Sequence, residues 1–144
     1  MKQYLVPFNI NIFDGIKAYS KLTDIDWTLK SKSIKVGDEV YFYCSKPVQM
    51  IVMKGIVSKI NVNFDEHIDD REFYIDTNAV KTNTGKTYTR IKFICKYSDE
   101  KSSMMSLEKL RQNGLRGNIQ TAQMINKNKD LHDYINSVDY TYKD

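Results

Sequence analysis

The alternation of apolar and polar residues predicts three β-strands in the middle of the chain, at residues 39–44, 49–62 and 87–97. Successive side chains of a strand point to opposite faces. The short loop at 45–48 joins the first two strands, so we expect these to pair in antiparallel fashion. Gly55 lies inside the second strand and marks a bend or a close backbone approach. One face of the first strand carries Val40, Phe42 and Cys44, and the other carries Tyr41, Tyr43 and Ser45.

The third strand has two chemically different faces. One face is predicted to join the core and carries Thr89, Ile91, Phe93, Cys95 and Tyr97. The other face places three cations in a row, Arg90, Lys92 and Lys96, between Tyr88 and Ile94. Such a row suits contact with a phosphate backbone. The alternative is that it forms the charged outer face of a barrel strand.

Capping residues and helical spacing predict three helices. The first lies at about 11–22, with Asn11 as its cap. The second lies at 107–113 and is capped by Ser106. The third lies at about 129–137, and its apolar stripe is expected to be buried. That stripe consists of Leu131, Tyr134, Ile135 and Val138.

The remaining segments are short or polar. Short strands are predicted at 3–6 and 73–75, and the tail from Asp139 onward is expected to fray. The segment 24–33 is mostly polar and is predicted to be an exposed loop that carries Trp27, the single tryptophan. A lone tryptophan in such a loop suggests a recognition role, and a plug at the edge of the core is the alternative.

Composition fits one ordinary globular domain of 144 residues, with 41% hydrophobic and 28% charged residues. The net charge is +4 and unevenly spread, with nine lysines against five acids in residues 1–60 and five bases without an acid in 81–97. Such a distribution can give one face that attracts phosphates, or simply solubilising lysines. We expect an intracellular, cytoplasmic protein without a membrane segment, because no signal peptide or long apolar run is present.

Features typical of enzymes are weak. Cys44 and Cys95 lack the spacing of a zinc site and are expected to be free thiols. The only cluster of acids with a histidine lies at 65–70, and it lacks the ligand spacing of a calcium loop. No glycine-rich phosphate loop is present. We therefore predict no catalytic residue, metal or cofactor. A metal-dependent nuclease or hydrolase that uses Asp65–Asp70 remains the enzymatic alternative.

Binding features are stronger. Trp27, the Tyr41/Tyr43/Ser45 face and the loop at 116–120 offer aromatic planes together with amide groups. Reading a base outside its stack needs both, namely π faces beside the ring and polar groups at its edge. The alternative is that Tyr41 and Tyr43 simply pack on a helix.

Two stretches are similar to a known family. V-G-D-E-V-Y-F-Y-C-S-K-P at 36–47, followed by I-V-M-K-G-I-V at 51–57, resembles the central signature of EVE domains of the PUA-like superfamily. S-L-E-K-L-R-Q-N-G-L-R-G-N-I-Q-T-A-Q-M-I at 106–125 resembles the family's closing segment. Trp27 stands where the related YTH domains place an aromatic pocket residue. The Arg/Asn-rich segment that many EVE domains carry near this tryptophan is absent, and the stretch 11–25 is shorter.

The resemblance implies an α+β fold, a small mixed, partly closed β-barrel with flanking helices, as a single domain over 1–144. It implies that Trp27 is a cage wall, that Ser45 contributes contacts at a strand end, and that Gln120 with Asn118 approaches the base edge. Lys46 and Arg116 would then meet phosphates. To these we add two groups from the strand patterns, Tyr43 for the base pocket and Arg90 with Lys92 for the phosphates.

The resulting hypothesis is a non-catalytic module that binds DNA or RNA and reads a modified base, one that carries a methyl group. A separate nuclease or modification protein of a restriction or defence system would be its partner. A protein-interaction or small-ligand module on the same barrel is the second alternative to this function.

Overall fold

The computed structural model describes residues 1–29 and 33–141 and contains a six-stranded mixed sheet. The strands lie in the order β2-β5-β4-β3-β1-β6. β1 and β3 are parallel, and the other neighbouring pairs are antiparallel. The strands are β1 (Gln3–Phe8), β2 (Asp24–Trp27), β3 (Glu39–Cys44), β4 (Met50–Val62), β5 (Tyr88–Lys96) and β6 (Gln123–Met124).

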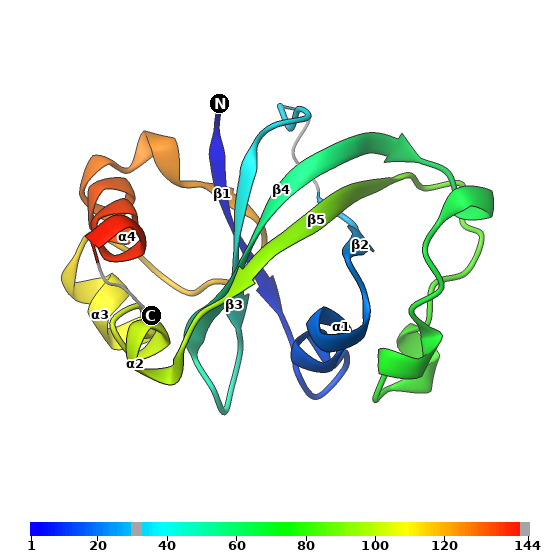
Figure 1. Cartoon of the computed structure of the whole chain (residues 1–144), viewed down its shortest axis with the longest axis horizontal. Coiled ribbons are helices and arrows are strands. Elements are labelled where there is room, and N and C mark those ends of the chain that lie inside the picture. Colours follow the sequence, from blue (N-terminus) through cyan, green and yellow to red (C-terminus); the bar gives the residue numbers. More distant parts are fainter. Residues whose placement is uncertain (30–32, 142–144) are drawn as a thin grey trace.

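The sheet is strongly curved but open. β2 and β6 end the order of strands, so the expected mixed sheet is present while its closure into a barrel is not. β4 and β5 sweep over the molecule as a long bent pair (Figure 1). At Gly55 a Cβ atom would lie only 2.5 Å from Ile91 Cγ2 and 2.9 Å from the Lys92 carbonyl oxygen. The predicted close backbone approach at Gly55 is confirmed.

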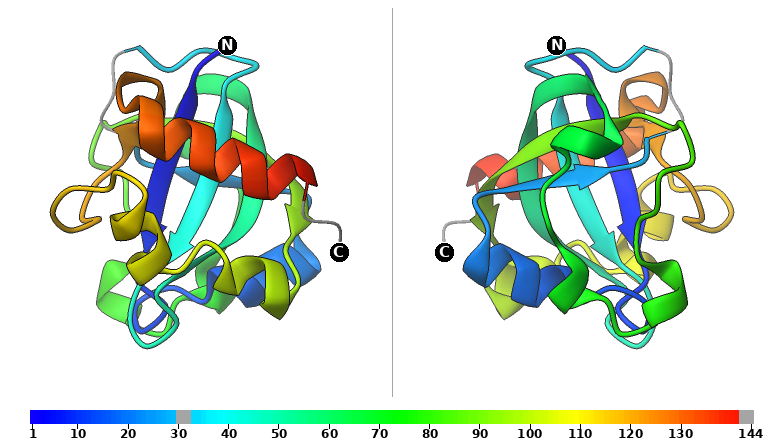
Figure 2. Two further views of the ribbon diagram at one scale, coloured as in Figure 1. Left: turned by 90° about the vertical axis from the view of Figure 1, so that its left-hand side faces the viewer. Right: turned by 90° about the vertical axis from the view of Figure 1, so that its right-hand side faces the viewer.

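Helices and 3-10 turns cover both faces of the sheet. α2 (Asp99–Ser103), α3 (Leu107–Gln112) and α4 (Lys129–Thr141) lie on one face, and α1 (Gly15–Lys21) lies on the other (Figures 1 and 2). The 3-10 turns are η1 (Phe64–Glu66), η2 (Arg71–Phe73), η3 (Thr77–Ala79) and η4 (Ile125–Lys127). Asp14 caps α1 by accepting from the Lys17 amide at 3.0 Å, so the cap lies three residues later than the predicted Asn11. Ser106 caps α3 as predicted.

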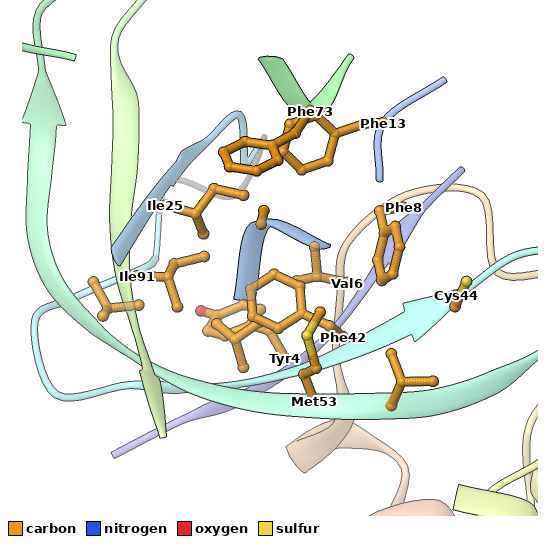
Figure 3. Close-up of a cluster of buried hydrophobic side chains, with 14 of the residues drawn as sticks. Tyr4, Val6, Phe8, Phe13, Ile25, Phe42, Cys44, Met53, Phe73 and Ile91 are labelled. Atoms are coloured by element: carbon orange, nitrogen blue, oxygen red, sulfur yellow. The ribbon is translucent and has the colours of Figure 1, made fainter. Parts of the chain in front are cut away.

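The side chains on the two faces of β3 pack in two separate hydrophobic cores. The first core lies on the α1 side, where β4 curves around Phe13, Phe42 and Met53 (Figure 3). The second core lies under α3 and α4 and contains Tyr41 and Tyr43. Val40 and Cys44 join Phe42 in the first core, so the predicted alternation along β3 is confirmed.

The end of α4 is tied to the sheet by a cluster around Asp139. Its carboxylate accepts hydrogen bonds from the hydroxyls of Tyr97 at 2.7 Å and Tyr41 at 3.0 Å, and from Lys54 at 2.8 Å. The prediction of a frayed tail is therefore wrong for 139–141, and it falls outside the described residues for 142–144.

Two further expectations are corrected. The segment 24–33 is predicted to be a loop, but Asp24–Trp27 forms the edge strand β2 on β5, because the buried Asp26 pairs with Arg90. Residues 30–32 of that segment lie outside the described part. The expected strand at 73–75 is a 3-10 turn followed by a single bridge between Phe13 and Tyr74. Among the described residues, no helix combines the length and apolarity needed to cross a bilayer.

Candidate functional site

Trp27 stands at the end of the edge strand β2, opposite Thr89 of β5. Its ring packs against Phe13, with 5.1 Å between the ring centroids and 54° between the planes. The residue is only partly buried, so part of the indole remains accessible. Trp27 is therefore both an edge residue of the first core and a wall for two neighbouring surface pockets.

The first pocket, which we call the Gln120 pocket, has a volume of about 190 Å³. β6 pairs with β1 through Tyr4 and Leu5, and this pairing carries the residues just before β6 alongside Pro7. The indole of Trp27 and the amide of Gln120 thus line one pocket, as predicted from two distant parts of the sequence. Its lining consists of Val6, Pro7, Trp27, Thr28, Leu29, Gln120, Thr121 and Ala122.

The second pocket, which we call the Lys81 pocket, lies beside the first and shares Trp27 and Thr28 with it. Its volume is about 390 Å³. Its other walls come from the exposed segment between η3 and β5 and from two tyrosines. The remaining lining residues are Tyr74, Ala79, Val80, Lys81, Thr82, Thr84, Lys86 and Tyr88.

Lys81 is buried among aromatic rings. Its side chain is 7% exposed, and Nζ lies 5.4–5.9 Å from the ring centroids of Phe13, Trp27, Tyr74 and Tyr88. The ammonium donates to Asp70 Oδ2 and, at 3.1 Å, to the Tyr74 hydroxyl. Burial opposes its charge, but the hydrogen bond and negative charge of Asp70 outweigh burial and raise the pKa of Lys81. Lys81 therefore stays positively charged at neutral pH.

The other residues predicted for the base pocket lie elsewhere. Tyr43 is 4% exposed and belongs to the second core, so its assignment to the pocket is corrected in favour of packing against the helices. Ser45 lies in the β3–β4 turn, where its amide donates to the Phe8 carbonyl oxygen at 3.0 Å. Asn118 is exposed and accepts a hydrogen bond from Arg111 at 2.8 Å. None of these three lines the Gln120 pocket or the Lys81 pocket.

The four residues predicted to contact phosphates also differ in their surroundings. Arg90 binds both carboxylate oxygens of Asp26, at 2.9 and 3.0 Å, and the Glu66 carbonyl oxygen at 2.9 Å. Since Asp26 is fully buried, the structure assigns Arg90 to holding β2 on β5 rather than to a phosphate. Three exposed cations of the predicted set remain, namely Lys46, Lys92 and Arg116.

Three of the four acids in the segment 65–70 pair with separate cations. Asp69 pairs with Arg71, whose hydrogen bonds lower the pKa of Asp69 to about 2. Glu66 pairs with Lys59, and Asp70 pairs with Lys81. Within the described ranges, no three histidine, cysteine or acidic side chains come together as metal ligands would.

The two cysteines are free, and burial raises the pKa of both thiols, that of Cys44 to about 11. Raised values leave the thiol protonated at neutral pH, and a protonated thiol is a poor nucleophile. The expectation that neither cysteine is activated agrees with this placement.

Sequence reasoning missed Lys81, Tyr74 and Tyr88. The alternation along 87–97 predicts Tyr88 on the solvent face, but it is 6% exposed and lies beside His67 and the ammonium of Lys81. In the sequence, Lys81 is simply one of five bases in 81–97. The one sequence signal for a buried Lys81 is its partner acid, Asp70, at the end of the acidic segment.

Comparison with known proteins finds similarity in structure and none in sequence families. No protein-family model matches the chain, and no curated protein matches its sequence. Human THYN1, solved in complex with DNA that contains 5-methylcytosine, is similar in structure, with a TM-score of 0.63 and 12% identity over 99% of this chain and 100% of that one. The ASCH protein of Zymomonas mobilis is similar with a TM-score of 0.57 and 10% identity over 94% of each chain. A protein from Agrobacterium tumefaciens is similar with a TM-score of 0.59 and 13% identity over 99% and 97%. The chain thus has a PUA-like fold.

Proposed function

We propose that this chain is a non-catalytic module that binds nucleic acid and holds one modified base in the Gln120 pocket. The observation that carries the proposal is the meeting of the Trp27 indole and the Gln120 amide in one pocket of about 190 Å³. Drug-sized ligands usually occupy about 300–1,000 Å³. A pocket below that range suits a small flat group such as a single base.

The chemistry of the pocket suits a base outside its stack. The indole offers a π face, and stacking of a base on an aromatic ring contributes about 1–3 kcal/mol. The Gln120 amide offers a donor and an acceptor to the base edge, as do the hydroxyls of Thr28 and Thr121. Val6, Pro7 and Ala122 add apolar surface against which a methyl group on the base can pack.

The structural comparisons support the ligand class. A protein of the same fold, human THYN1, was solved with DNA that contains 5-methylcytosine, and the likeness spans almost all of both chains. At 12% identity the likeness concerns the fold, so the ligand itself is part of our proposal. A separate nuclease or modification enzyme would act on the nucleic acid that this module marks.

The remaining exposed cations are suited to the backbone of the ligand. Lys46, Lys92 and Arg116 would contact phosphates and supply affinity without sequence information. Each phosphate contact steepens the fall of affinity with salt, by about 0.7 in the logarithmic slope for single strands and about 0.9 for duplex DNA. Salt-dependent binding separates this proposal from a protein-interaction or small-ligand module.

The test is binding of the parent chain to a panel of single- and double-stranded DNA and RNA with and without methylated bases. Trp27→Ala is expected to weaken binding about tenfold to a hundredfold, because one stacking contact is lost. Tyr140→Ala is the matched control, since Tyr140 is an aromatic residue that is 89% exposed.

Two results would contradict the proposal. One is a Trp27→Ala variant that is folded and binds the best oligonucleotide as tightly as the parent. The other is cleavage of the oligonucleotides by the parent on addition of Mg²⁺ or Mn²⁺, lost in Asp69→Ala and Asp70→Ala, which would favour the enzymatic alternative.

A further inference from the structure

The Lys81 pocket has no role in the function proposed above, although it shares Trp27 and Thr28 with the Gln120 pocket. It is the larger of the two, at about 390 Å³, and falls within the usual range for a ligand site. The indole of Trp27 thus lies between two adjacent pockets. Two adjacent pockets are suited to two neighbouring nucleotides of a single strand.

We infer that the Lys81 pocket is a second nucleotide subsite and that Lys81 donates a hydrogen bond to a carbonyl oxygen of the base bound there. This base is the neighbour of the one in the Gln120 pocket, so the inference rests on the proposed function. The chemical class that it selects is a neutral base with an exocyclic oxygen, such as thymine, uracil, cytosine or guanine.

The geometry of Lys81 fits a fixed donor. An ammonium group has three N–H donors. Two of them have acceptors, in Asp70 and in the Tyr74 hydroxyl, and among the described residues no acceptor takes the third. The rings of Trp27 and Tyr88 lie within 5.5 Å of Nζ and restrict its movement. A donor already held in position loses little entropy when it binds a ligand.

Stability alone explains this arrangement poorly. Lysine is almost never fully buried unless it is paired. A buried ion pair repays its desolvation only when the remaining polar atoms also find partners. Asp70 is 1% exposed, and its Oδ1 atom has no hydrogen-bond partner among the described residues. Retaining a charge here at that cost is consistent with a role in recognition.

The walls of the pocket supply the other contacts that a nucleotide needs. Trp27 and Tyr74 are partly exposed aromatic residues beside Lys81. Lys86 is exposed at the same pocket and is placed to meet a phosphate. Aromatic surface and cations at the surface are the usual features of a single-strand binding site, and the Lys81 pocket adds a buried donor to them.

The experiment varies the nucleotide on each side of the preferred base in the best oligonucleotide found for the parent. At one of the two sides, a base with a carbonyl oxygen is expected to bind about tenfold more tightly than adenine, which has none, since hydrogen bonds to charged groups are among the stronger ones. Lys81→Met is expected to abolish this preference while the preference for the modified base remains, and Lys81→Arg is expected to retain part of it.

Controls separate recognition from folding. Lys81→Met leaves Asp70 buried without its cation, so the double variant Lys81→Met/Asp70→Asn removes both charges and is checked by thermal melting. Lys86→Met removes an exposed lysine of the same pocket and is expected to weaken all oligonucleotides alike, with a shallower salt dependence and an unchanged neighbour preference.

The outcomes also separate the two proposals. If the parent binds no oligonucleotide, the proposed function and the second subsite both fail. If the parent binds but shows no preference among neighbours, or if the folded double variant keeps the preference, the subsite is wrong and the proposed function stands.

Discussion

Asp139 is predicted to be the residue that fixes α4 on the sheet, and Asp139→Asn tests this. The carboxylate is 16% exposed and accepts from Tyr97, Tyr41 and Lys54 at 2.7, 3.0 and 2.8 Å. An amide keeps one acceptor oxygen and loses the negative charge, so the bond to Lys54 and one bond to a tyrosine are weakened or lost.

The size of the effect follows from these contacts. A hydrogen bond to a charged group contributes about 1.5–3 kcal/mol, and removing one partner of a fully buried pair costs about 3–5 kcal/mol. Lys54 keeps a second partner, Glu39, at 3.3 Å, which reduces the loss. We therefore expect the free energy of unfolding to fall by about 2–4 kcal/mol. The melting temperature should fall by roughly 10 °C.

The Asp139 carboxylate should also make the stability of the protein depend on pH. Burial tends to raise the pKa of Asp139, but the hydrogen bonds from Lys54 and the two tyrosines outweigh burial and lower it below its ordinary value. A lowered pKa in the folded state gives stability that is present above the unfolded pKa of about 3.9 and is lost as pH falls through the folded value. The parent should therefore lose this contribution below about pH 4, and Asp139→Asn should not.

The assay is thermal and urea unfolding at neutral pH and in acid, with Asp133→Asn as the control. Asp133 is also on α4, but it is exposed, and its charged partners among the described residues are Lys129 and His132 of the same helix. Equal stability of Asp139→Asn and Asp133→Asn at neutral pH would refute the reasoning.

Two further substitutions test the framework of the site. Gly55→Ala should lower the free energy of unfolding by about 1–3 kcal/mol, because the new methyl group would collide with Ile91 and the Lys92 carbonyl oxygen. Urea unfolding measures this loss, with Ser58→Ala, a change at an exposed position of the same strand, as the control. Equal losses in the two variants would contradict the prediction. Arg90→Met should lower stability by about 2–4 kcal/mol by leaving the Asp26 carboxylate buried without its cation, whereas Lys92→Met should not. A melting temperature for Arg90→Met equal to that of Lys92→Met would argue against the pair as the tether of β2.

The parts of the fold that sequence predicted well depend on local patterns. The period of two along 39–44 assigned Val40 and Tyr41 to opposite faces, and both cores bear this out. Gly55 was identifiable because a glycine inside an apolar strand often marks a bulge, a bend or a close approach of another backbone. Ser106 was identifiable because a helix cap depends on a few neighbouring residues.

The parts that sequence could not predict depend on distant partners. Asp26 makes the segment 24–29 look like a polar loop until Arg90 neutralises it across the sheet. Tyr43 was placed on the correct face of β3, but the strand pattern does not show that α3 and α4 cover that face. Lys81 looked like one of several surface bases, since burial of a lysine depends on an acid eleven positions earlier and on rings from four segments.

These distant contacts also explain why Trp27 suits a binding site. Asp26 and Trp27 are consecutive residues of β2, so their side chains point to opposite sides of the strand. On one side, Asp26 accepts from Arg90 and from the Ile68 amide at 2.8 Å. On the other, the indole rests on Phe13 and borders both pockets. Sites on strands hold their geometry better than sites on loops. Since the Asp26–Arg90 pair holds this edge strand in place, the position of the indole depends on a contact that touches neither pocket.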